Sequence, residues 1–225
     1  MHLTFLFSTA EAHCSHINSF GFLSNIRRSL HNNFVATLVR AFVADRVNYC
    51  VGLLAASPKK TTAKLQLVFS AAAQVMLNCG KYDRGLTHFR RHVLHWLDVT
   101  DRIRFRLCIH VYKCRHSMAP GYLIHLCHPV ASIDGRGHLW SGSIGQLQLP
   151  RIKMSTYRSH AFGHAGPSTW NALPNTLKCS SHSLPTFRHH LKHFLLFFLL
   201  ANRARLRLSQ LTRYMNYLPT YLLTL

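Results

Sequence analysis

The stretch DVTDRIRFRLCIHVYKCRH, residues 98–116, is the clearest helical segment of this sequence. Asp98 and Asp101 stand at its start, where carboxylates cap free N–H groups and favour the helix dipole. We therefore interpret this close carboxylate pair as structural and not as acid–base machinery. The apolar residues recur at the spacing of one wide helix face, namely Ile103, Leu107, Val111 and Cys114 with Phe105, Ile109 and Tyr112 beside them.

An earlier segment, residues 33–55, is predicted to form a well-buried helix. Its length and dense apolar content favour a helix that packs against neighbours. The main apolar stripe contains Phe34, Leu38, Phe42, Tyr49 and Leu53. The residues that widen this stripe are Val35, Val39, Val43 and Cys50.

Further helices are marked by their start and stop signals. SPKK at 57–60 looks like a helix start, with Ser57 as N-cap and Pro58 in the first helical position. This helix is predicted to end near Gly80, and Pro120 opens a short helix that reaches about Cys127. The apolar face of the longer helix is predicted from Leu65, Val68, Ala72, Val75 and Met76.

The periodicity disappears between Pro129 and Ser181, where glycines and prolines interrupt the chain. We predict an irregular connector there, with short strand-like pieces at 146–149 and 151–154. Ser183 is a good N-cap for a following amphipathic helix. The apolar residues of that helix are Phe187, Leu191, Phe194, Leu195 and Phe198.

The predicted fold class is mainly α: a helical bundle-like region, an irregular Gly/Pro-rich connector and a C-terminal amphipathic helix. We divide the chain into five segments. These are an unassigned segment at 1–14, a helical thumb-like region at 15–130, a connector at 131–182 anchored by Trp170, the amphipathic helix at 183–205 and an unassigned tail at 206–225.

The charge of the chain is strongly unbalanced. Lys and Arg number 27 against 6 Asp and Glu, which gives a formal net charge of +21 at pH 7. Asp134 is the last acidic residue, so the arginines that follow have few partners within the chain. Such a chain is expected to bind polyanions, and phosphate is the natural counterion.

The seven cysteines are odd in number and widely spaced, and most lie in apolar runs. We interpret them as reduced, buried thiols in an intracellular protein, nuclear or cytoplasmic. Cys108, Cys114, Cys127 and His128 could form a zinc site only if two helices converged, so we predict no metal site. His189 and His193 are one helical turn apart, and we interpret them as solvent-facing.

Basic residues beside aromatic ones are the candidate nucleic-acid contacts, because phosphates need cations and bases stack on aromatic rings. We interpret Trp96 and Trp170 as structural anchors, since a large aromatic ring can hold a segment that lacks regular hydrogen bonding. The indole N–H of Trp170 would then need a buried partner. The candidate contacts are Arg102, Arg104, Arg106, Arg151, Lys153, Arg158, Arg188 and Lys192.

No catalytic constellation is recognised in the sequence. Two-metal polymerase chemistry uses clustered carboxylates, and no two acidic residues in this chain are adjacent. The glycine-rich stretch at 135–145 fits no phosphate-binding motif. We predict no enzyme activity, no cofactor and no small-molecule substrate. The apolar run at 194–201 is too short to span a bilayer, so we predict no transmembrane segment.

Several segments resemble, in sequence and order, the region after the polymerase palm in non-LTR (LINE-type) retrotransposon reverse transcriptases of the jockey and chicken-repeat class. The resemblance covers about residues 15–198, and its most specific pieces are LHWLDV, MAPGYL and GPSTWNALP. It implies a helical thumb-like and C-terminal region of a longer polyprotein. Family members carry an endonuclease and a polymerase upstream, the latter with a Tyr/Phe-x-Asp-Asp turn. This sequence contains neither region.

The chain departs from the family pattern at two positions: it has Gln74 where the family usually has Arg, and Val93 where the family usually has Glu. The resemblance and the charge together predict a non-catalytic fragment that binds RNA or RNA–DNA hybrid non-specifically through basic helices. Two alternatives stay open at this point. One is a degenerate open reading frame with no activity, and the other is a basic membrane-surface protein that uses the helix near 185–200.

Overall fold

A computed structural model describes residues 27–48, 51–78, 86–88, 90, 93–133, 144–150, 161–178 and 183–197. These residues are mostly helical, which confirms the mainly α class. Within these ranges the only β pairing is an isolated antiparallel bridge between Pro129 and Leu147. None of the described helices is both long and apolar enough to cross a bilayer.

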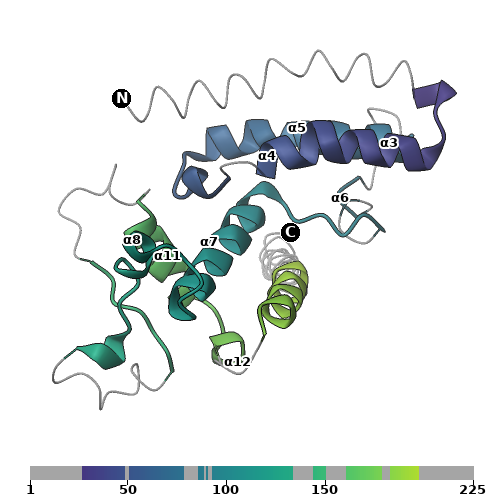
Figure 1. The fold of residues 1–225 in the computed structure, drawn as a ribbon. Coiled ribbons are helices and arrows are strands. Elements are labelled where there is room, and N and C mark those ends of the chain that lie inside the picture. The colour runs from purple at the N-terminus through teal and green to yellow at the C-terminus, as the bar shows by residue number, and fades with distance from the viewer. Residues whose placement is uncertain are drawn as a thin grey trace, which may run out of the picture.

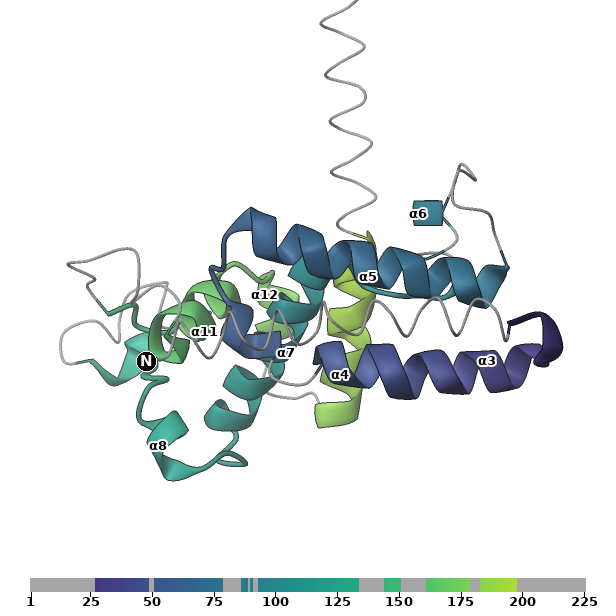
Figure 2. The ribbon, with the colours of Figure 1, turned by 90° about the horizontal axis from the view of Figure 1, so that it is seen from above.

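Figure 1 shows α3 continuing into α4, with α5 beside them along one edge of the molecule and α7 running away from them toward α8 and α11. Seen from above in Figure 2, α3 and α5 form a hairpin, and the helix over 184–197 passes beneath it in this view, while Figure 1 shows that helix beside α7. The elements are the 3₁₀ turn η1 (Arg27–Ser29), α3 (Asn32–Val39), the π-turn η2 (Arg40–Ala44), α4 (Asp45–Asn48), the 3₁₀ turn η3 (Val51–Leu54), α5 (Lys59–Leu77), α6 (Leu86–His88), α7 (Val99–Arg115), α8 (Gly121–Ile124), the 3₁₀ turn η5 (Val130–Ser132), α11 (Phe162–Asn171), α12 (Asn175–Lys178) and the helix over 184–197.

The helix α7 is shared by both apolar cores of the protein. Its first half contributes Val99, Ile103 and Leu107 to a core with α3, α4 and α5. Its second half contributes Val111 and Tyr112 to a core with α11 and the helix over 184–197. The wide apolar face predicted for 98–116 exists because this helix has neighbours on two sides.

The buried residues of the first helical segment follow a spacing of four. Since an α-helix has about 3.6 residues per turn, such a spacing would drift around the helix. The π-turn η2 corrects this drift, because its turns are wider and the Asp45 N–H bonds to the Arg40 carbonyl five residues back. The buried residues are Val35, Val39, Val43, Val47, Val51 and Ala55.

The predicted main stripe of this segment was therefore wrong. Phe34, Phe42 and Leu53 are 64%, 52% and 51% exposed, and the valines that we expected only to widen the stripe form the core. Small β-branched residues allow α3 and α5 to approach closely, whereas phenylalanines would hold them apart. On the α5 side, Ala72 is fully buried in the same core.

One predicted helix cap is wrong, and the other lies outside the described residues. At the start of α5 the N-cap is Pro58 and not Ser57, and the N–H groups of Thr61 and Thr62 bond to the Pro58 carbonyl. At its end the left-handed residue is Asn78, with φ of 53°, whereas Gly80 lies outside the described residues. Asparagine tolerates this conformation better than other side chains with a Cβ atom, so it can end a helix as glycine does.

The connector predicted at 131–182 is not irregular throughout, because it contains α11 and α12. Pro167 lies inside α11, where the missing N–H removes a helix bond. Packing outweighs this cost: a Cβ on Gly166 would lie 3.1 Å from the Val111 side chain, so glycine lets α11 lie directly on α7. Trp170, one helical turn beyond Gly166, is therefore a helical core residue.

Trp170 is 1% exposed, and its indole N–H donates to the Gly145 carbonyl at 3.1 Å. The neighbouring Asn171 side chain pairs with both backbone groups of Leu147, at 2.9 and 2.8 Å. These contacts hold residues 144–150 against α11. No strand forms at 146–149 apart from the bridge at Leu147, and 151–154 lies outside the described residues.

The helix over 184–197 begins after Ser183, whose side-chain oxygen accepts from the Thr186 N–H at 3.4 Å. Phe187, Leu191 and Leu195 are at most 4% exposed and pack in the second core. This part of the apolar stripe is covered inside the molecule, whereas Phe197 near the end of the described helix is exposed. The segments 1–14 and 206–225, and the last predicted turns of this helix, lie outside the described residues.

Candidate nucleic-acid interface

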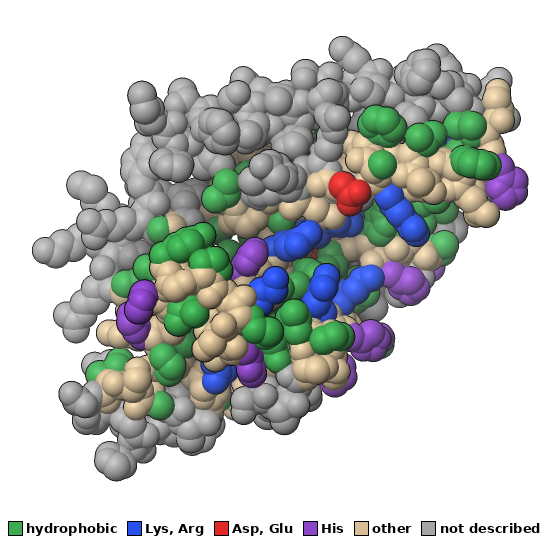
Figure 3. Space-filling model, in the orientation of Figure 1, with side chains coloured by type: hydrophobic (Ala, Val, Ile, Leu, Met, Phe, Trp, Pro, Cys, Tyr) green, Lys and Arg blue, Asp and Glu red, His purple; other side chains and the backbone are tan. Residues whose placement is uncertain are grey.

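A basic cleft of about 500 Å³ lies between α4, the start of α7 and the helix over 184–197. Figure 3 shows Lys and Arg side chains gathered in the middle of this face, with an acidic side chain at the upper border. None of the described residues that line the cleft is acidic. The lining consists of Arg40, Asn48, Leu94, His95, Trp96, Leu97, Arg102, Phe105, Arg106, Arg188, His189 and Lys192.

Four of the predicted contact residues meet at this cleft. Arg102 and Arg106 are one turn apart on α7, and Arg188 and Lys192 are one turn apart on the helix over 184–197. Each pair thus presents two cations on a single helix face. The fold brings the two pairs together although they are far apart in sequence.

Arg40, which belongs to the π-turn η2, also lines the cleft, and the sequence analysis did not select it. Its position depends on the tertiary placement of the first hairpin. No local pattern in VRAFVA indicates that this arginine faces the last helix. The valine spacing of four is the sequence signal that would have fixed the orientation of this segment.

Arg102 forms the inner wall of the cleft. Its Nε donates to the Leu97 carbonyl and its Nη1 to the Asn48 side chain, each at 2.9 Å. Its guanidinium also lies 4.2 Å from the centre of the Phe69 ring, a cation–π contact. Burial, and then repulsion from Arg106 and Arg90, lower the Arg102 pKa to about 10, against an opposing effect of Asp98. The group stays protonated at pH 7, and the repulsion would be relieved by a bound anion.

A polar network holds the segment before α7 in place. Arg90 is 5% exposed, forms an ion pair with Asp98 and donates to the Ser70 hydroxyl at 2.9 Å. The side chain of Asp98 makes no cap bond, contrary to our prediction. The Val99 N–H is instead satisfied by the Gln66 side chain of α5, at 2.9 Å. A residue distant in sequence therefore caps α7 and frees Asp98 to neutralise Arg90.

Trp96 and Phe105 supply an aromatic surface to the cleft. The Trp96 ring meets Phe69 edge to face at 5.6 Å, and its backbone N–H bonds to the Arg90 carbonyl at 2.9 Å. His95 beside it has φ of 50°, a left-handed conformation that is costly for a residue with a Cβ atom. The surrounding contacts thus fix the position of Trp96.

Of the other predicted contacts, only Arg104 lies among the described residues, and it does not line the cleft. Arg104 points elsewhere: it is half exposed, and its Nη1 lies 3.6 Å from Asp101 one turn earlier on α7. Arg151, Lys153 and Arg158 lie outside the described residues. Trp170 belongs to the second core and does not line the cleft.

The described cysteines are Cys108, Cys114 and Cys127, and all three are buried free thiols. Burial raises the pKa of Cys108 and of Cys127 to about 12. His189 and His193 are exposed, with ring centroids 5.0 Å apart. Within the described ranges no three His, Cys, Asp or Glu residues are placed to hold a metal ion.

No protein-family model matches this chain, and no curated protein or solved structure matches it significantly.

Proposed function

We propose that this chain is a non-catalytic fragment related to LINE-type reverse transcriptases, and that it binds RNA or RNA–DNA hybrid through the basic cleft. The observation that supports this proposal is the convergence of Arg102, Arg106, Arg188 and Lys192 on one cleft whose described lining holds no carboxylate. Like charges gathered in a lining without carboxylates create a positive potential that attracts phosphates. The helical organisation agrees with the thumb-like region that the resemblance implies.

The binding should be non-specific and sensitive to salt. Each phosphate neutralised by a cation contributes about 0.7 to 0.9 to the slope of log K against log salt concentration. Four cleft cations therefore predict a slope of about −3, equivalent to a loss of roughly 50-fold between about 50 and 200 mM salt. The high net charge of the whole chain adds binding elsewhere, so matched variants are needed.

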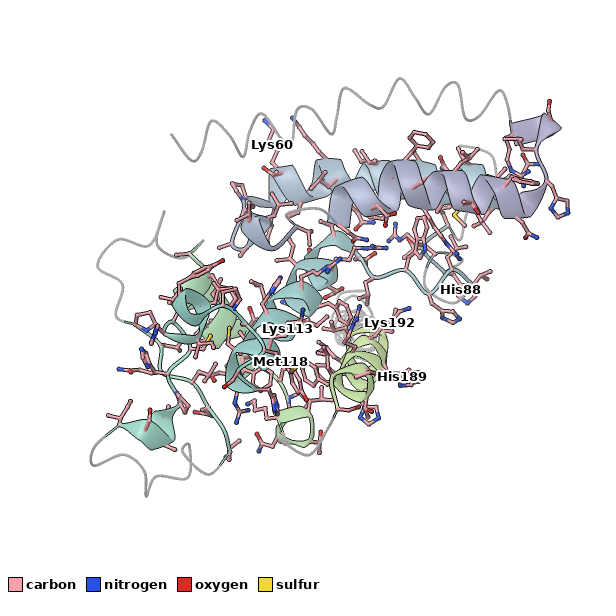
Figure 4. All side chains as sticks on the ribbon, viewed as in Figure 1. Lys60, His88, Lys113, Met118, His189 and Lys192 are labelled. Carbon is pink, nitrogen blue, oxygen red and sulfur yellow. The ribbon has the colours of Figure 1, made fainter. Side chains whose placement is uncertain are left out.

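The test compares two triple variants with equal net charge. The first changes Arg106, Arg188 and Lys192 to glutamine, and the control changes the exposed Lys59, Lys60 and Lys64 of α5 to glutamine. In Figure 4, Lys60 lies at the start of α5, and Lys192 lies on the helix beside α7. Fluorescence polarisation with labelled RNA over a salt series gives the slope for each protein.

We expect the slope of log K against log salt concentration to become shallower by about 2 in the cleft variant. In the control variant it should become shallower by less than about 1. Equal losses in the two variants would mean that net charge alone attracts RNA and that the cleft is no site. A wild-type protein that neither unfolds cooperatively nor binds RNA would favour the degenerate open reading frame. Binding to anionic vesicles but not to RNA would favour the membrane-surface alternative.

A further inference from the structure

The basic cleft combines a cationic side and an aromatic side, and this combination selects among nucleic acids. We infer that the cleft binds an unpaired strand, with the backbone phosphate at Arg106, Arg188 and Lys192 and a base stacked on Trp96. This inference rests on the proposed function and narrows its ligand from RNA or hybrid in general to single-stranded segments.

The size of the cleft is the first argument. A volume of about 500 Å³ lies in the range of pockets that hold small molecules, about 300 to 1,000 Å³. Such a space accepts a nucleotide or two but not a double helix. A duplex could touch only the rim of the cleft, and its phosphates would not reach the inner wall at Arg102.

The aromatic side is the second argument. Trp96 and Phe105 line the same cleft as the cations, together with the apolar Leu94 and Leu97. In a duplex both faces of each base are covered by neighbouring bases, so an aromatic surface gains nothing from it. An unpaired base has free faces and stacks on such rings with little dependence on its identity.

The third argument is that the aromatic side is formed before any ligand arrives. The Phe69 ring packs edge to face against the Trp96 ring, with the ring centroids 5.6 Å apart. The backbone N–H of Trp96 donates to the Arg90 carbonyl at 2.9 Å. His95, with φ of 50°, accepts an unfavourable backbone conformation at this point. Strained residues persist where the surrounding structure fixes them, and they gather at ligand sites. A pre-formed surface lowers the ordering cost of binding.

The experiment uses the full chain and three labelled probes of about 10 nucleotides, a common size for sites that bind single strands. These are oligouridylate RNA, the same backbone with abasic positions, and an RNA–DNA hybrid hairpin. The proteins are wild type, Trp96→Leu and the conservative Trp96→Phe. Thermal unfolding of each protein is followed in parallel.

We expect wild type to bind oligouridylate about 10-fold more tightly than the abasic probe. Oligouridylate should also bind more tightly than the hybrid. Trp96→Leu should lose about 10-fold on oligouridylate and nothing on the abasic probe, with an unchanged salt slope. Trp96→Phe should retain most of the affinity. If Trp96→Leu fails to fold, the wild-type comparison of the three probes decides.

Two results would overturn the inference. If the hybrid or the abasic probe binds wild type as tightly as oligouridylate, the cleft does not use unpaired bases. In that case the proposed function can still hold. It holds if wild type binds with a steep salt dependence and the cleft triple variant loses that dependence. If no probe binds with a salt dependence that the cleft variant reduces, both the inference and the proposed function fail.

Discussion

The two tryptophans among the described residues, Trp96 and Trp170, lie beside opposite ends of α7, and each has an arginine guanidinium above its ring. Arg102 is 5.8 Å from the Trp96 ring centre, and Arg115 is 5.2 Å from that of Trp170. Trp170 is almost fully buried, whereas Trp96 is half-buried and lines the cleft. A tryptophan with an arginine above its ring therefore belongs to a closed core at one end of α7 and to an accessible surface at the other end.

The difference arises from what surrounds each ring. Trp170 packs on Phe187, itself stacked on Tyr112, and its N–H is used by the Gly145 carbonyl. Trp96 packs on one side against Phe69 and the first core, and on the other side it lines the cleft together with Arg102, which lies above its ring. The buried ring of Trp170 stabilises the fold, while the part of the Trp96 ring that lines the cleft remains accessible to a ligand.

The largest expected effect is on the buried ring. Trp170→Ala should lower the free energy of unfolding by about 3 to 5 kcal/mol, because it leaves a cavity in the second core and removes the bond to Gly145. Urea denaturation measures this loss. Trp96→Ala should cost clearly less, since that ring is only half-buried. If Trp170→Ala melted like wild type but bound RNA weakly, the assignment of the two roles would be reversed.

The charged network near Trp96 can be broken at Asp98. Asp98→Ala leaves Arg90, which is 5% exposed, without its carboxylate partner. The expected loss of unfolding free energy is about 3 kcal/mol, since removing one partner strands a buried charge. The exposed Asp45→Ala serves as control and should stay within about 0.5 kcal/mol of wild type. Equal effects of the two changes would show that the ion pair contributes nothing particular.

The smallest effect concerns the thiols of the second core. The pKa values of Cys108 and Cys127 are raised from 9.0 to about 12 in the folded protein. Their contribution is complete below pH 9.0, and it is lost as the pH rises toward 12, because the unfolded chain releases these protons first. For Cys108 the loss near pH 10 is about 1.4 kcal/mol, equivalent to one pKa unit.

Denaturation of wild type and of Cys108→Ala at increasing pH isolates this effect. The variant is less stable at neutral pH, but its further loss above pH 9.0 should be smaller than that of wild type. Parallel loss in both proteins would mean that Cys108 titrates normally when folded. The first core should show no corresponding dependence on this thiol, because Cys108 packs in the second core alone.

Much of the helical organisation was predictable from the sequence, because helix-forming periodicity is local. Residues 98–116 were expected as a helix and α7 spans Val99–Arg115. The error in the first hairpin had a physical cause: a single α-helical period was assumed, and the π-turn at Arg40–Ala44 changes which residues face inward. The glycines and prolines around Trp170 predicted irregular chain, but the contact with α7 outweighs their weak helix propensity.

The candidate site was predictable only in part. Arg102, Arg106, Arg188 and Lys192 were recognised as basic residues on helix faces, and the helical period alone puts Arg104 on another face than Arg102, yet nothing in the sequence placed the two pairs together. The role of Trp96 as the aromatic side of a cleft was also not expected. Both facts depend on contacts between segments that are remote along the chain.

The sequence by itself determined the helical class, the excess positive charge and the absence of adjacent carboxylates. These follow from composition and short-range periodicity, which do not depend on how the helices pack. Only the tertiary structure decided which cations share a cleft, which tryptophan is closed off and which side chain caps α7. The reason is that burial and charge repulsion act through space, and α7 receives different neighbours on its two ends.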